Sequence, residues 1–222
     1  MPLYEAIPSE ARAAVIVIQE AYGVTGYIER VADDLADAGY YAVAPHLFHR
    51  SETTLVEYGD IKTAVEMIVT LDDAKELMDV DAAIEHLRSV GFADEQIGIV
   101  GFCMGGRVTF LTCARRDIGA GVGFYGGAIV GGWPPGFAAL DGEAATLKAP
   151  WLGLFGDQDP SIPVEHVEQL RAALKDAPVE TEIVRYPEAG HGFHSEPRPA
   201  SYHAESAADA WTRTLDWFGR HL

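Results

Sequence analysis

Short runs of consecutive apolar residues recur along the chain at intervals that leave room for helices between them. Residues 14–19 read Ala-Val-Ile-Val-Ile-Gln, with no polar residue before the last position. Such an uninterrupted run is typical of a strand that is covered on both faces of a parallel sheet. Similar segments predict five further strands, at residues 40–45, 97–102, 120–125, 151–155 and 180–186.

Between these runs, apolar residues recur at helical spacing. After the first run, Thr25 is a suitable N-cap, Ile28, Val31, Leu35 and Ala38 share one face, and Gly39 ends the helix. The same criteria predict four more helices, from Asp72 or Asp73 to Gly91, and at residues 104–115, 163–175 and 202–218.

Two segments give weaker patterns. Residues 51–71 begin as a polar loop and continue with Ile61, Val65 and Ile68 at helical spacing, which indicates a short helix or a lid-like excursion. Residues 126–148 show no periodicity and read as a surface loop over one end of the sheet. Alternating strands and helices predict one α/β domain over residues 1–222, a three-layer sandwich with helices on both faces of a mostly parallel sheet.

The charge of the chain narrows the classes of partner. The chain has 16 Lys and Arg residues and 34 Asp and Glu residues, which gives a formal charge of −18. This balance argues against nucleic acid or an anionic membrane surface as a partner. No run approaches the roughly 18 apolar residues of a membrane span, and the first residues show no basic-then-apolar leader pattern. We therefore expect a cytoplasmic protein that is a monomer or a small homo-oligomer.

Cys103 and Cys113 are the two cysteines. On one continuous helix, ten residues separate them by about 15 Å, which is too far for a disulfide. Cys103 is thus expected to be a free thiol in a reducing compartment.

Cys103 lies in the hexapeptide Gly101-Phe102-Cys103-Met104-Gly105-Gly106, between a predicted strand and a predicted helix. A nucleophile flanked by glycines two residues away on each side is typical of a sharp strand-to-helix turn. Alternatively, Cys103 is a buried structural thiol, since free cysteine is among the most buried residue types.

Four kinds of polar residue directly follow predicted strands: Glu20, Cys103, Asp157 or Asp159, and His191. Ligands of parallel sheets bind beyond the carboxyl ends of the strands, so these residues could meet at one rim. Their order of nucleophile, acid and histidine is that of the α/β-hydrolase triad, which favours a chemical role for Cys103.

The chemistry of acyl transfer suggests a role for each group. Cys103 would attack as a thiolate, and His191 would serve as the base. A carboxylate would orient His191; we prefer Asp159 and keep Asp157 as the alternative. The amide of Met104, at the start of the helix, and that of Ala21 are the candidate oxyanion donors.

With these features the chain resembles the dienelactone hydrolase (carboxymethylenebutenolidase) family of α/β-hydrolases over nearly its whole length. The most specific matches are the cysteine turn and Gln19-Glu20 after the first strand. The matching segments are residues 17–24, 39–40, 45–48, 98–106, 124–126, 156–159 and 188–193.

The resemblance implies a Cys103-His191-Asp159 triad, with Glu20 in contact with the resting thiol and helping it to deprotonate when substrate arrives. It implies hydrolysis of small cyclic enol esters to open-chain keto acids through an acyl-thiol intermediate, with no cofactor and no metal. Candidate substrate-binding residues lie in or near the matching segments: Tyr22, Tyr125, His194 and Arg198.

Two departures from the family pattern bear on fold and substrate. Only about thirteen residues precede the first buried strand, so the N-terminal edge of the sheet should be reduced. Relatives acting on dienelactone carry an Arg shortly after the catalytic His, where this chain has His194-Ser195. Arg198 could replace it only if residues 196–199 fold back; otherwise the substrate would be a neutral ester or lactone.

We therefore expect a cysteine-dependent hydrolase of a small ester or lactone. The alternative is a non-catalytic α/β-hydrolase scaffold that binds a small molecule or senses redox state through Cys103. His191 and His194 have an H-x-x-H spacing, but without a third ligand in this glycine-rich loop we expect no metal site.

Overall fold

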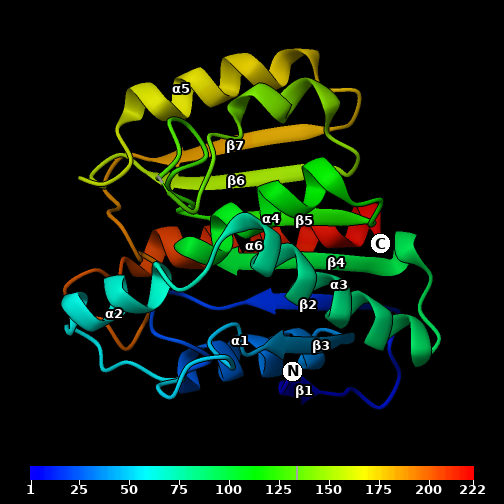
Figure 1. Cartoon of the computed structure of the whole chain (residues 1–222). Helices are drawn as coiled ribbons and strands as arrows, with labels where there is room; N and C mark the ends of the chain where they lie inside the picture. The colour runs from blue at the N-terminus through cyan, green and yellow to red at the C-terminus, as the bar shows by residue number, and fades with distance from the viewer. Residues whose placement is uncertain (134) are drawn as a thin grey trace.

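Seven strands form one sheet that is parallel except for its first strand. The computed structural model describes residues 1–133 and 135–222, and its strand order is β1-β3-β2-β4-β5-β6-β7 (Figure 1). The strands are β1 (Leu3–Ala6), β2 (Ala13–Ile18), β3 (Tyr40–Pro45), β4 (Ile97–Phe102), β5 (Ala120–Phe124), β6 (Trp151–Gly156) and β7 (Thr181–Tyr186). Only β1 is antiparallel to its neighbour, β3.

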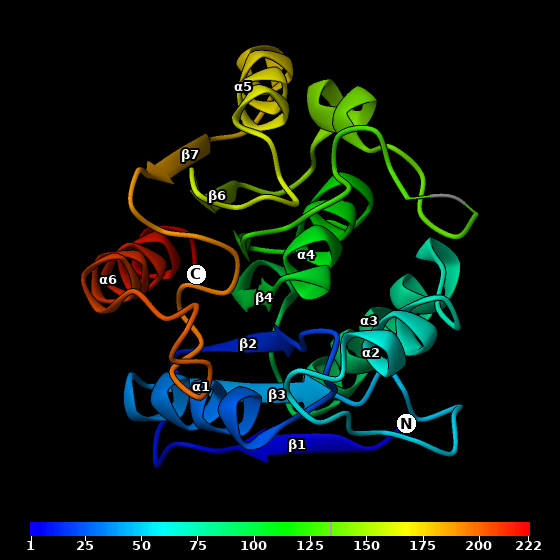
Figure 2. The ribbon, with the colours of Figure 1, turned by 90° about the vertical axis from the view of Figure 1, so that its left-hand side faces the viewer.

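Helices cover both faces of the sheet, as expected. Figure 2 shows α1 and α6 on one face and α3, α4 and α5 on the other. The α-helices are α1 (Gly26–Asp37), α2 (Ile61–Ile68), α3 (Asp73–Ser89), α4 (Met104–Arg115), α5 (Val164–Ala173) and α6 (Ala204–His221), and the 3₁₀ helices are η1 (Asp94–Gln96), η2 (Asp141–Thr146) and η3 (Leu174–Asp176).

The central strands explain why the apolar runs were continuous. Every residue of β2 and β4 is buried, because helices pack on both sides of them. The last helix also packs closely: a Cβ at Gly98 of β4 would lie 2.9 Å from the Phe218 ring of α6. The sheet is therefore a rigid support for the loops at its carboxyl edge.

The six predicted strands and six helices are all present, with ends that shift by a few residues. The short helix expected in residues 51–71 is α2. The N-terminal edge is reduced, but residues 3–6 form the strand β1, which the sequence analysis missed. Residues 126–148 are not entirely loop, because η2 and a bridge between Trp133 and Phe137 lie within them.

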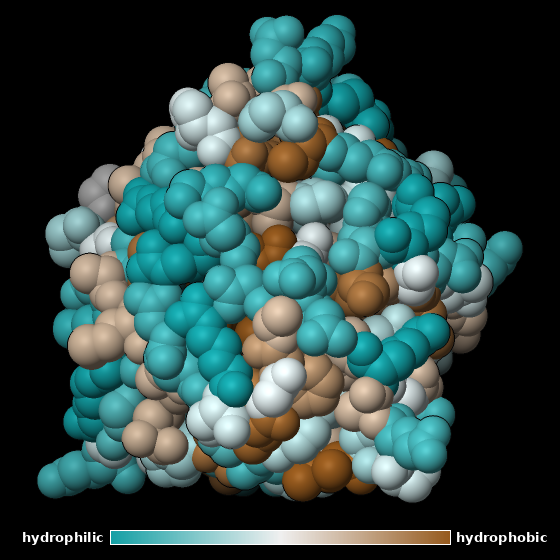
Figure 3. Space-filling view, turned by 90° about the vertical axis from the view of Figure 1, so that its right-hand side faces the viewer, coloured by the Kyte–Doolittle hydropathy of each residue, from teal (hydrophilic) through white to brown (hydrophobic). Residues whose placement is uncertain are grey.

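The amino ends of the strands lie opposite the edge that carries the candidate residues. In Figure 3 this side of the molecule is mostly hydrophilic, with apolar residues scattered over it. No described helix combines the length and the apolar composition that crossing a bilayer requires.

Candidate active site

Cys103 lies at the turn between β4 and α4. It is the N-cap of α4, with φ 56° and ψ −116°, a conformation that non-glycine residues rarely adopt. Its amide donates a hydrogen bond to the carbonyl of Phe124 at 3.0 Å, which ties the turn to the end of β5. The thiol is partly exposed.

The glycines on either side permit this turn because backbone passes close to them. A Cβ at Gly101 would lie 2.1 Å from the carbonyl oxygen of Gly105, and one at Gly105 would lie 2.5 Å from that of Ile18. The first turn of α4 therefore approaches β2 and β4 directly. The amides of Gly106 and Arg107 bond to the carbonyl of Cys103, and those of Met104 and Gly105 come before the first bond of the helix, where an amide has no acceptor within the helix.

His191 and Asp159 meet across two loops. The Nδ1 atom of His191 lies 2.6 Å from Oδ2 of Asp159. The other carboxylate oxygen, Oδ1, accepts hydrogen bonds from the amide and the hydroxyl of Ser161, at 2.8 and 2.6 Å. Asp159 is almost fully buried, so its carboxylate is held firmly in place.

Asp157, the alternative acid, is engaged elsewhere. Both of its oxygens accept hydrogen bonds from Arg185, each at 2.7 Å. Between the two candidates, the geometry therefore selects Asp159 as the partner of His191.

The charges around His191 outweigh its burial. Burial disfavours the imidazolium, but the negative charge of Cys103 and the hydrogen bond with Asp159 together raise the pKa of His191 to about 10. Burial likewise works to raise the pKa of Asp159, yet its contacts with His191 and Ser161 leave that pKa lowered. This arrangement favours a protonated His191 beside the Asp159 carboxylate.

Close backbone packing brings the acid loop and the histidine loop together. A Cβ at Gly156 would lie 2.3 Å from the carbonyl oxygen of Ala189, which accepts a hydrogen bond from the amide of Gln158 at 2.9 Å. Glycine at position 156 thus allows the loops after β6 and β7 to run against each other.

Cys103 and His191 line the same cavity, of about 790 Å³. The two residues with candidate oxyanion amides, Ala21 and Met104, line it as well, as do Tyr22 and Arg198. Six of the residues that the sequence analysis singled out therefore share one space.

Arg198 reaches this cavity because its loop folds back. The amide of Arg198 bonds to the carbonyl of Ser195, and the amide of His203 bonds to that of Phe193, at 3.0 and 2.9 Å. The guanidinium lies over the Tyr22 ring, 5.5 Å from its centroid. Residues 196–199 therefore fold back. This is the condition under which Arg198 could take the place of the arginine that relatives acting on dienelactone carry shortly after the histidine.

Glu20 is buried behind this surface, 1 % exposed. Its Oε1 lies 3.5 Å from Nη1 of Arg198, and Tyr58 donates to its Oε2 at 3.4 Å. Burial raises the pKa of Glu20, although Arg198 and His191 act to lower it. The closest polar partners found for this carboxyl are therefore Arg198 and Tyr58, and the contact with the Cys103 thiol implied by the resemblance is absent from the hydrogen bonds of the described residues.

Two candidate substrate-binding residues lie outside the described lining of the cavity. Tyr125 is fully buried, with its ring 5.2 Å from that of His191, so it packs behind the histidine. His194 bonds through Nδ1 to the hydroxyl of Tyr27 at 2.7 Å, and burial lowers its pKa to about 4. It borders a different hollow, between α1 and α6. Both residues support the site from behind.

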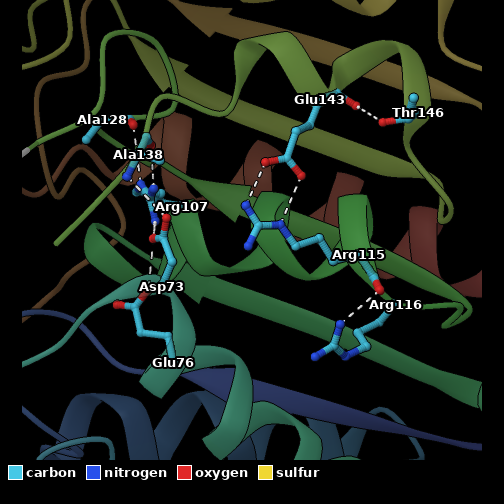
Figure 4. A network of polar contacts seen from close by, with 9 residues as sticks. All are labelled: Asp73, Glu76, Arg107, Arg115, Arg116, Ala128, Ala138, Glu143 and Thr146. Carbon is cyan, nitrogen blue, oxygen red and sulfur yellow. Dashed lines mark hydrogen bonds and ion pairs between the residues drawn. The ribbon is translucent and has the colours of Figure 1, made fainter.

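Arg107 was missed by the sequence analysis, although it lines the cavity and is only 3 % exposed. Figure 4 shows its guanidinium between the Asp73 carboxylate, at 2.6 Å, and the carbonyls of Ala138 and Ala128, at 2.6 and 3.3 Å. These partners are more than twenty residues away in the chain. The one local signal is a charged residue in the first turn of α4 that seven uncharged residues follow.

No cluster of three or more His, Cys, Asp or Glu residues suited to a metal ion is found in residues 1–133 and 135–222. His191 and His194, despite their spacing, bond to different partners, Asp159 and Tyr27.

Comparisons with known proteins agree with this architecture. The whole chain, residues 1–222, matches the profile of the dienelactone hydrolase family. A protein from Escherichia coli strain K12 named "Putative carboxymethylenebutenolidase" is 39% identical, over 100% of this chain and 83% of the relative. One from Bradyrhizobium named "Probable 2-oxo-3-(5-oxofuran-2-ylidene)propanoate lactonase" is 35% identical, over 94% of this chain and 84% of the relative.

Among solved structures, the "Putative Dienelactone Hydrolase" of Klebsiella pneumoniae is similar, with a TM-score of 0.90 and 40% identity over 99% of this chain and 92% of that one. The match therefore extends over both the sequence and the fold. The chain belongs to the dienelactone hydrolase family of α/β-hydrolases.

Proposed function

We propose that this protein hydrolyses a small ester or lactone through an acyl-thiol intermediate on Cys103. The observation that supports this most directly is the Asp159-His191 pair beside the same cavity as Cys103, at a strand-to-helix turn with a strained backbone. A binding protein has no need for a base and an acid behind a thiol.

In the first half of the reaction, the Cys103 thiolate attacks the carbonyl carbon. The oxyanion that forms accepts hydrogen bonds from the amides of Ala21 and Met104. The C–O bond then breaks, and protonated His191 gives its proton to the leaving oxygen, unless an enolate leaves unaided. Asp159 keeps the imidazolium oriented during this transfer.

In the second half, water releases the acyl group. Neutral His191 takes a proton from the water as it attacks the thioester carbon, and the same amides hold the second oxyanion. The C–S bond breaks, which yields the carboxylic acid and a Cys103 thiolate beside the imidazolium. The resting thiol forms again when Glu20 returns its proton to that thiolate. The chemistry needs no cofactor and no metal, and we expect it in a cytoplasmic monomer or small homo-oligomer.

The position of Arg198 in the cavity supports the proposal that the substrate carries a carboxylate near its ester bond. A substrate carboxylate at this guanidinium would compete with Glu20, which lies 3.5 Å from it. Glu20, freed from that ion pair, would then be the more able to accept the thiol proton. The names of the relatives, a carboxymethylenebutenolidase and a lactonase of an oxofuranylidene acid, describe substrates of this anionic class.

The test compares two cysteine variants. Cys103→Ala should lower kcat/KM for p-nitrophenyl acetate by at least about 10⁴-fold, because the nucleophile is removed. Cys113→Ala is the control: this thiol is fully buried near the carboxyl end of α4, outside the described cavity lining, and its removal should leave activity near that of the wild type. Retained turnover in Cys103→Ala would exclude the proposed mechanism.

Intact mass spectrometry after brief incubation with the ester separates catalysis from binding. An acyl adduct on the wild type that disappears with time supports turnover through the thiol. A permanent adduct would support the binding or redox-sensing alternative instead.

A further inference from the structure

Tyr58 lies in a segment that is mostly exposed, yet its side chain turns toward the site. Its ring packs edge-on against that of Tyr22, with the ring centroids 4.7 Å apart. Its hydroxyl lies 3.1 Å from Oγ1 of Thr25 and donates to Oε2 of Glu20 at 3.4 Å. Tyr58 therefore links the segment between β3 and α2 to the turn that carries Glu20.

The backbone of this segment packs against the same turn. A Cβ at Gly23 would lie 2.3 Å from the carbonyl oxygen of Thr54, and Gly23 has a φ of +92°. The amide of Val56 donates to the carbonyl of Tyr22 at 3.0 Å. Main-chain contacts therefore hold Tyr58 in place, in addition to the packing of its ring.

Glu20 and Cys103 leave neighbouring strands at the same level of the sheet. Ile18 of β2 pairs with Gly101 of β4, and Glu20 and Cys103 each lie two positions beyond these partners. Burial raises the pKa of the Tyr22 hydroxyl, and the charges of Glu20 and Cys103 act in the same direction. The carboxyl and the thiol are therefore neighbours at two adjacent strand ends.

Glu20 must be ionised when it takes the thiol proton, since a proton from solvent would otherwise occupy it first. Burial raises the pKa of Glu20, and the charges of Arg198 and His191 oppose that rise. The hydrogen bond from Tyr58 opposes it as well. A substrate carboxylate that draws Arg198 away leaves Tyr58 as a donor. A neutral phenol stabilises the carboxylate without cancelling its charge, so Glu20 stays basic.

Thr25 supports the donor role of Tyr58. A phenolic hydroxyl that gives its single proton to Glu20 can still accept a hydrogen bond from the Thr25 hydroxyl. Thr25 is the N-cap of α1, but its side chain makes no capping hydrogen bond with this fully described helix. Its proton is thus available to Tyr58, and successive hydrogen bonds of this kind polarise and strengthen one another.

Other titratable groups surround the Glu20 carboxyl: Tyr22, Tyr27, Cys103, Tyr125, His191 and Arg198. Within residues 1–133 and 135–222, none of them is hydrogen bonded to this carboxyl. Tyr58 is therefore the group whose removal should change the pKa of Glu20 without removing a charge.

We propose that Tyr58 is a positioning residue, whose hydroxyl holds the Glu20 carboxylate oriented and ionised so that it can take the proton of Cys103. In this step the S–H bond of Cys103 breaks, Glu20 gains the proton, and Tyr58 keeps its own. The inference rests on the proposed acyl transfer to Cys103 and adds to it a residue that does not touch the reacting atoms.

The pH dependence of kcat/KM for p-nitrophenyl acetate tests this role. Tyr58→Phe keeps the ring but removes the donor, so the pKa of Glu20 should rise. His191, with its pKa raised to about 10, stays protonated over the acidic limb, so this limb reports Glu20. We expect the limb to move up by about 0.5–1 pH unit, which lowers kcat/KM there by about 3- to 10-fold. The plateau above it should stay within about twofold of the wild type.

Two further variants frame this result. Thr25→Val removes the hydroxyl that polarises Tyr58, and we expect a smaller shift of the acidic limb in the same direction. Tyr41→Phe is the matched control, because it removes a hydrogen bond of the same kind, from Tyr41 to Glu5 at 2.5 Å, outside the described cavity lining. Its profile should superimpose on that of the wild type.

An unshifted profile for Tyr58→Phe would overturn this role and leave the proposed function intact, as long as Cys103→Ala has lost turnover. A loss that is equal at every pH would overturn it too, because such a loss indicates a purely structural tyrosine. Retained turnover in Cys103→Ala would instead remove the acyl transfer on which the inference rests.

Discussion

Asp159 and Asp157 are two residues apart, yet their partners differ. Asp159 bonds to His191, whereas Asp157 is held by Arg185. Asp159→Asn removes the negative charge and can present an amide to Nδ1, which favours the wrong tautomer of His191. We expect kcat/KM for p-nitrophenyl acetate to fall by about 10² to 10⁴-fold.

The matched variant Asp157→Asn should keep most of this activity and lose mainly the ion pair with Arg185. Steady-state kinetics of both variants decides the assignment, and an Asp157 variant that is equally inactive would contradict it.

Glu76 is a buried carboxyl in α3 whose ionisation opposes folding. Burial raises the pKa of Glu76 to about 8, although Arg107 lies 3.8 Å away and acts to lower it. In the unfolded chain this pKa is near 4.5. Between these two pKa values the folded state holds a proton that the unfolded state releases. The contribution of Glu76 to the free energy of unfolding is therefore fully present below about pH 4.5 and is lost as the pH rises to about 8.

Glu76→Gln cannot ionise and should not show this loss. We expect its free energy of unfolding, relative to the wild type, to increase by on the order of 2–4 kcal/mol between pH 5 and pH 8. Urea unfolding at several pH values measures the difference. Glu85→Gln, at an exposed position of the same helix, is the control and should give a nearly constant difference.

Helix α4 carries two arginines whose ion pairs differ in burial. Arg107 and its partner Asp73 are 3% and 14% exposed, whereas Arg115 and Glu143 are 34% and 32% exposed (Figure 4). Arg107→Ala removes the guanidinium from the Asp73 carboxylate and from the carbonyls of Ala128 and Ala138, and leaves that carboxylate with the amide of Ala138 as donor. We expect the change to cost about 3–5 kcal/mol of folding stability. Arg115→Ala should cost less than about 1 kcal/mol.

Chemical denaturation of the two variants gives the comparison. Similar losses would mean that the buried pair of Arg107 with Asp73 contributes no more to stability than the half-exposed pair of Arg115 with Glu143.

Elements with a regular pattern were predictable, and those fixed by distant contacts were not. The uniformly buried strands β2 and β4 are evident from their apolar runs. β1 is four residues long at the sheet edge, with a mixed burial pattern, so no periodicity marked it. The positions of Cys103, Asp159 and His191 at one edge of the sheet were predictable from their places after strands. The return of Arg198 to the cavity depends instead on turns within its loop and its contact with Tyr22.

His194 shows the same limit at the site itself. Three residues after His191, it was a reasonable substrate contact, but the loop turns its ring toward Tyr27 and Trp211. The sequence places residues at an edge of the sheet; the path of each loop decides which side chains enter the cavity.

At the scale of the whole molecule, a net charge of −18 makes the fold repel itself. Salt screens this repulsion, with a Debye length near 10 Å at 0.1 M. We expect the Tm to rise as NaCl increases from 20 to 300 mM, because the many exposed ion pairs contribute little each. Differential scanning calorimetry measures the change, and a falling Tm would show that those ion pairs dominate.

The burial of Cys113 leaves thiol reagents a single target in the native protein. Its sulfur is so enclosed that a Cβ at Gly121 would lie 2.4 Å from it, and burial raises the pKa of the thiol well above its usual range. Cys103 is then the one thiol that an alkylating reagent can reach in the folded chain. The moles of iodoacetamide taken up per mole of protein therefore count intact sites, so that preparations can be compared by active fraction before any substrate is known.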